Sequence, residues 1–64
     1  MNDKTHEILA LACTNLSNLV HLLNKDAEHY AEKGGIIGEA ISYSRACMAS
    51  NILRLLQQLL DEEG

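Results

Sequence analysis

The fold is decided by the stretch Lys33-Gly34-Gly35-Ile36, the one strong interruption of a helical pattern. Each glycine costs about 1 kcal/mol inside a helix, so the pair predicts a turn at 34-35. A cation followed by glycine is typical of a helix C-terminus, and Gly35 or Ile36 is the expected start of the next helix. We therefore expect one domain over 1-64, with a helix at about 4-33 and a second at about 36-62.

Before the turn, apolar residues recur at alternating steps of four and three, which is the spacing of one face of a helix. Polar residues occupy the other face, and a cap at Asn2 or Asp3 is expected to begin the helix. The apolar positions are Leu9, Cys13, Leu16, Val20, Leu23, Ala27 and Tyr30.

After the turn, two apolar rows run side by side and together span about 200° of the helix surface, about twice the stripe of an ordinary surface helix. One partner helix cannot cover such an arc. The first row comprises Ile37, Ile41, Met48, Ile52, Leu55 and Leu59, and the second comprises Ala46, Ala49, Leu53, Leu56 and Leu60.

A chain of 64 residues is near the lower limit for a fold that an unaided core holds together. The sequence predicts an all-α fold, an antiparallel helical hairpin that dimerises into a four-helix bundle, because a second copy covers what one hairpin leaves exposed. The predicted dimer core consists of Leu16, Val20, Leu23, Ile41, Met48, Ile52, Leu55 and Leu59.

The positions of the two cysteines do not predict a disulfide bond between them. In a hairpin that turns at 34-35, Cys13 is level with Leu56 and Cys47 is level with Leu22, so the cysteines are roughly 13 Å apart along the helices. Cys13 is expected in the core, and Cys47, on the polar side of its helix, at a half-buried position or, alternatively, as an exposed thiol. Reduced thiols, with no secretory signal and no apolar run long enough for a membrane span, predict a cytoplasmic protein.

The charge and the histidines exclude several classes of function. A formal net charge of −4 disfavours nucleic acid and anionic membranes as partners. His21 and His29 are about 12 Å apart on one helix, too far to share one metal ion. Cys47 has only Tyr43 and Arg45 near it and no histidine at helical spacing on the same face to act as its base. We therefore expect no enzyme activity, no metal and no cofactor.

Two surface features are candidates for partner binding. The first is a secondary stripe on the first helix, in which Leu11 and Leu22 point away from the main apolar face. The second is a column on the outside of the second helix that includes Tyr43, Cys47 and Arg54, and tyrosine and arginine are enriched at interface hot spots.

Two resemblances add to this interpretation. The run from Ala10-Leu11-Ala12-Cys13 through Leu22-Leu23, followed by a helix from Ala46 through Leu60, is similar to short two-helix proteins of pseudomonads and their phages. Some of those are anti-activators that bind and disable a host regulator. The layout also resembles the plasmid RNA-modulating hairpin proteins, which dimerise into a four-helix bundle and bind paired RNA loops.

The sequence thus favours a homodimeric interaction module, an inhibitor or adaptor that binds and masks a regulatory partner such as a host transcription factor. The alternatives are an RNA-binding regulator of the plasmid copy-number type and a structural subunit of a larger assembly.

Overall fold

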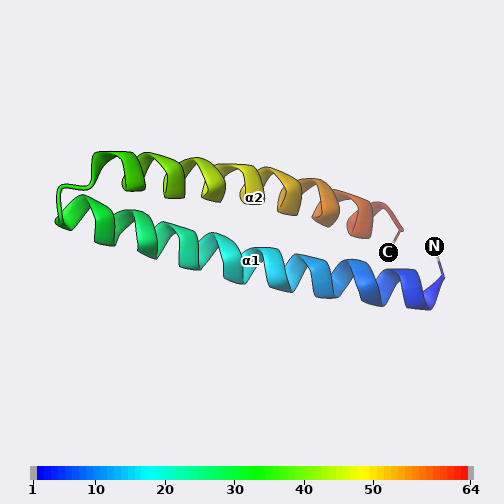
Figure 1. Ribbon diagram of the computed structural model, residues 1–64. Coiled ribbons are helices and arrows are strands. Elements are labelled where there is room, and N and C mark those ends of the chain that lie inside the picture. Colours follow the sequence, from blue (N-terminus) through cyan, green and yellow to red (C-terminus); the bar gives the residue numbers. More distant parts are fainter. Residues whose placement is uncertain (1, 64) are drawn as a thin grey trace.

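The computed structural model describes residues 2–63 and consists of two helices, α1 (Asp3–Glu32) and α2 (Ile36–Glu63). They pack side by side as an antiparallel hairpin, with the start of α1 and the end of α2 both at the end of the rod opposite the turn (Figure 1). Both helices begin and end within one residue of the expected ranges. Met1 and Gly64, the ends of the expected domain, lie outside the described residues.

Helix α1 begins at the predicted cap. The Asn2 side chain accepts a hydrogen bond from the Thr5 backbone N–H at 2.8 Å, and the Asn2 carbonyl accepts one from the His6 N–H at 3.0 Å. The side-chain bond pairs one of the four N–H groups that a helix leaves unpaired at its start, and the carbonyl bond is the first regular bond of the helix. Asp3 in the first turn adds a negative charge where the helix dipole favours one.

The turn takes the form that the glycine pair predicts. Gly34 has a φ of 76°, in the left-handed region that residues with a Cβ rarely adopt. The Gly35 N–H donates to the Tyr30 carbonyl at 2.8 Å and the Gly34 N–H donates to the Ala31 carbonyl at 3.2 Å. This pair of bonds is a Schellman motif, which ends α1 and reverses the chain. The Gly35 carbonyl then accepts the first bond of α2, from Glu39 at 2.9 Å.

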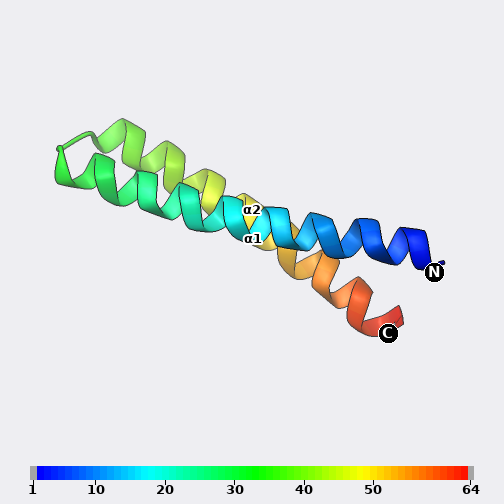
Figure 2. The same ribbon diagram turned by 90° about the horizontal axis from the view of Figure 1, so that it is seen from below.

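The helices meet along what we call the seam. On each helix its members are small or aliphatic residues that are buried or half-buried, and α2 uses its second apolar row. The seam comprises Leu9, Ala12, Cys13, Leu16, Val20, Leu23 and Ala27 of α1 with Ser42, Ala46, Ala49, Leu53, Leu56 and Leu60 of α2. Small residues occupy the α2 side of the seam from Ser42 to Ala49, and the helices cross at an angle (Figure 2).

The seam encloses few side chains. Its buried residues are Ala27, Ser42, Ala46 and Ala49, each 3–7% exposed, and among residues 2–62 no large side chain is completely enclosed. The Cα atoms extend over 47 × 14 × 11 Å, so the molecule is a thin rod with most side chains at its surface. The hairpin therefore leaves most of its apolar surface uncovered.

Candidate functional site

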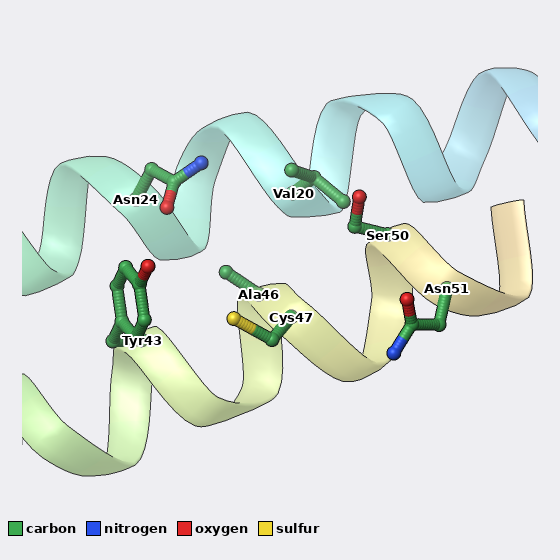
Figure 3. Close-up of a pocket in the computed structure, with 7 residues that line it drawn as sticks. All are labelled: Val20, Asn24, Tyr43, Ala46, Cys47, Ser50 and Asn51. Carbon is green, nitrogen blue, oxygen red and sulfur yellow. The ribbon is translucent and has the colours of Figure 1, made fainter. Parts of the chain in front are cut away.

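A shallow groove of about 280 Å³ opens on one side of the hairpin, between the two helices (Figure 3). Residues of both helices line it. Its lining consists of Val20 and Asn24 of α1 with Tyr43, Ala46, Cys47, Ser50 and Asn51 of α2.

The spacing of these residues explains the shape of the groove. Tyr43, Cys47 and Ser50 follow one another at steps of four and three, so they form one edge along α2. Ala46 is 3% exposed and forms the floor, where a larger side chain would fill the space. In Figure 3 the Tyr43 ring stands at one end of the groove beside Asn24, and the Ser50 hydroxyl points toward α1 near Val20. The result is an open notch on the surface of the rod.

The groove lining offers a particular chemistry. Asn24 and Asn51 carry amide donors and acceptors, Tyr43 and Ser50 carry hydroxyls, and Cys47 carries a free thiol. None of the seven lining side chains is a carboxylate, an imidazole or a cation. The lining therefore supplies hydrogen bonds and a small apolar floor, without an acid or base beside the thiol.

The opposite side of the hairpin is apolar. On α2, Met48 and Ile52 lie on the far side of the seam from Tyr43 and Ser50, as the helical angle of 100° per residue requires. The same holds on α1 for Leu19 and Leu22 relative to the groove residue Asn24. Because the groove residues of both helices share one side, the two apolar rows share the other.

We call this side the apolar face. Its large side chains are between 44% and 77% exposed in the hairpin, and they come from both helices along most of their length. The apolar face comprises Ile8, Leu11, Leu19 and Leu22 of α1 with Ile37, Ile41, Met48, Ile52, Leu55 and Leu59 of α2.

The structure separates the five residues predicted to bind a partner. Leu11 and Leu22 lie on the apolar face, whereas Tyr43 and Cys47 line the groove and Arg54 is exposed without being part of the lining. Tyr43 is 61% exposed and Cys47 is also exposed, as the expected outer column requires, and both line the groove as well. Of the two positions considered for Cys47, the structure shows the exposed one.

The predicted dimer core also falls into two parts. Leu16, Val20 and Leu23 are half-buried in the seam, where they contact α2 of the same chain. The other five members are exposed on the apolar face, and they are Ile41, Met48, Ile52, Leu55 and Leu59. Their burial in a dimer stays a prediction.

The sequence pattern missed four groove residues, Val20, Asn24, Ala46 and Asn51. Val20 was expected in the core and Ala46 in an apolar row, and the two asparagines read as ordinary surface residues. Asn24 reaches the groove because the hairpin places it level with Tyr43 and Ala46. Two features of the sequence could have identified Asn24 as a groove residue. One is the height at which a hairpin turning at 34-35 places it beside α2, and the other is the small side chain at position 46.

A second depression lies along the outer part of α1, lined by Glu7, Ala10, Leu11 and Thr14. The Thr14 hydroxyl donates to the Ala10 carbonyl at 3.2 Å, so its polar group is already used within the helix. This depression therefore adds apolar surface beside Leu11.

Within residues 2–63, no three histidine, cysteine or acidic side chains gather closely enough to hold a metal ion. Over the same residues, neither helix has an apolar stretch that is long enough to cross a bilayer. No family model matches the chain, and no curated protein or solved structure matches it.

Proposed function

We propose that this chain is a non-enzymatic protein–protein interaction module of the cytoplasm, an inhibitor or adaptor that binds and masks a regulatory partner such as a transcription factor. One observation carries the proposal. Ten large aliphatic side chains lie exposed on the apolar face, whereas the buried apolar residues of the seam are three alanines.

Exposed apolar surface on this scale favours a binding function. Monomeric soluble proteins rarely expose contiguous apolar patches of more than a few hundred Å², and larger patches mark sites of protein interaction. A hairpin that encloses so little surface binds other molecules through its exposed side chains. The net charge of −4 disfavours a phosphate backbone as the ligand.

Part of that surface serves the chain itself in our proposal. Two hairpins associate into a four-helix bundle, which is the common arrangement for short amphipathic helices joined by a tight turn. Light scattering in dilute buffer is expected to give twice the chain mass. A mass well above the dimer would instead favour a structural subunit of a larger assembly.

The regulatory partner binds where polar anchors are available. The groove combines a tyrosine, two amides and a thiol beside an apolar floor, and Arg54 lies near it on α2. Aromatic and arginine side chains supply much of the energy at protein interfaces. A regulator bound there would be masked by steric exclusion, because the 47 Å rod covers a long strip of its surface.

Affinity capture tests this function. The tagged wild-type chain, a Tyr43→Ala variant and a Ser17→Ala control are used as baits in an extract of the cells that make the protein. Ser17 lies on α1, exposed and outside the groove. The wild-type and control baits are expected to retain one protein at near-equal stoichiometry, and Tyr43→Ala is expected to lose at least 90% of it.

The captured protein must then bind the purified chain directly, with an affinity that calorimetry or sedimentation can measure. Recovery of the chain alone would contradict the proposal. A gel shift with hairpin RNA that weakens steeply with salt would point to RNA as the ligand instead.

A further inference from the structure

The accessible surface of the whole chain exceeds that of a compact monomer by about the area that a second copy would cover. The accessible surface of the chain is 4896 Å². A compact monomer of this mass exposes about 4,100 Å², so the hairpin carries roughly 800 Å² in excess. Each partner of a standard protein interface buries about 800 Å². One interface of ordinary size therefore accounts for the excess.

Two charged residues within this face indicate how the copies are arranged. Arg45 interrupts the α2 row between Ile41 and Met48, and Asp26 continues the α1 row one turn beyond Leu22. Both are exposed in the single hairpin. The groove places Asn24 level with Tyr43 and Ala46, so Asp26 and Arg45 are also at nearly the same height, in the half of the rod near the turn.

We propose that a second copy packs on the apolar face with both turns at the same end of the bundle. This inference rests on the dimer of the proposed function and assigns its contact face and its topology. A two-fold axis parallel to the helices then stacks α1 of one copy on α2 of the other at equal heights. Asp26 of each copy meets Arg45 of the other, and the apolar residues of each row meet apolar residues.

The opposite topology fails on charge. With the turns at opposite ends, α2 packs on α2 of the second copy. A residue on the turn side of the middle of the rod then faces a residue of the second copy that is equally far from the middle on the other side. Arg45 would then be buried against the second copy's Leu55, far from the second copy's Asp26, so the interface would supply no opposite charge for it. A charge buried without a partner is strongly unfavourable. The same-end arrangement pairs both charges across the interface.

This arrangement has a consequence for the regulatory partner. The groove lies on the side of the hairpin opposite the apolar face, so the second copy does not cover it. A same-end dimer presents two grooves on opposite outer surfaces, each with an accessible Tyr43 and Cys47. The dimer contact and the regulatory contact therefore use different sides of the same hairpin.

Pulsed electron resonance on spin-labelled full-length chain tests the topology. The label is attached at Lys33→Cys, in a chain whose native cysteines are replaced by Cys13→Ser and Cys47→Ser. Lys33 is exposed at the turn, outside the apolar face and the groove. The same-end dimer is expected to give a label separation below about 30 Å, since packed helices are about 10 Å apart. A separation near the 47 Å length of the rod would overturn the topology.

Charge-reversal variants test the interface by sedimentation equilibrium. Arg45→Glu is expected to raise the dimer dissociation constant about tenfold or more, and adding Asp26→Arg to it is expected to restore most of the affinity. The control is Lys25→Glu, because Lys25 is exposed on the side of α1 that faces away from α2. It is expected to change the dissociation constant less than threefold.

Each outcome has a distinct meaning. A helical chain that remains monomeric at 100 μM, or an Arg45→Glu variant that dimerises as tightly as wild type, would overturn this inference. A same-end dimer that captures no other protein would leave it standing and contradict the proposed function. A monomer that captures a regulator would do the reverse.

Discussion

Gly38 is the residue at which a single added carbon tests the packing at the turn. A Cβ there would lie 2.5 Å from Cδ1 of the Tyr30 ring and 2.8 Å from its Cγ. Contacts this short force the ring to move, at a cost of about 1–3 kcal/mol. Alanine would otherwise gain about 1 kcal/mol of helix propensity over glycine. We expect Gly38→Ala to lower the free energy of unfolding by about 1 kcal/mol, measured by urea titration at a fixed chain concentration.

The control for this prediction removes the ring. In a Tyr30→Ala background the clash is absent, so Gly38→Ala is expected to raise the free energy of unfolding by up to about 1 kcal/mol. The sign of the effect therefore reverses between the two backgrounds. If the substitution stabilises both backgrounds equally, Tyr30 does not pack on Gly38 in solution.

At the scale of the helices, the sequence predicted most of the fold because its signals were local. Gly34 and the Asn2 cap marked where α1 ends and begins, and the spacing of apolar residues predicted both helices. The sequence did not determine which of the two rows on α2 contacts α1, because both have helical spacing. The choice depends on side-chain size, since Ala46 and Ala49 allow closer helix packing than Met48 and Ile52.

The candidate site was less predictable for the same reason. A groove depends on the height at which residues of the two helices meet and on the volume of the side chain between them. Tyr43 and Cys47 were identified by residue type alone. Asn24 lines the groove because the hairpin places it at the same height as Tyr43 and Ala46. Pairing by height is a property of the assembled hairpin, which a single helix does not reveal.

The seam itself predicts which substitution unfolds the hairpin. Leu23 is half-buried against α2, so Leu23→Glu places a charge where no cation faces it within the seam. We expect the loss of at least 3 kcal/mol, enough to abolish most of the helical circular dichroism at 25 °C. Ser17→Glu, an exposed change about 120° round α1 from Leu23, is the control and is expected to retain wild-type helicity. Equal helicity in both variants would show that Leu23 does not carry the hairpin contact.

For the molecule as a whole, folding and association are expected to be one process. Among residues 2–62, the side chains that the seam buries to more than nine-tenths are three alanines and a serine, too few to offset the conformational entropy of two long helices. Most of the stabilising apolar burial must then come from the second copy, whose association is concentration-dependent. Each tenfold increase in chain concentration is expected to add about 1.4 kcal/mol to the stability of the folded dimer.

The thermal midpoint, followed by circular dichroism from 1 to 100 μM, should therefore rise steadily with chain concentration. Met48→Glu, which charges the apolar face without touching the seam, is expected to lower the midpoint at every concentration. Lys25→Glu, on the outer side of α1, is expected to follow the wild-type curve. A midpoint that stays constant over this range would mean that one hairpin folds on its own. The apolar face would then be free for a different protein, because no second copy would be needed to hold the helices together.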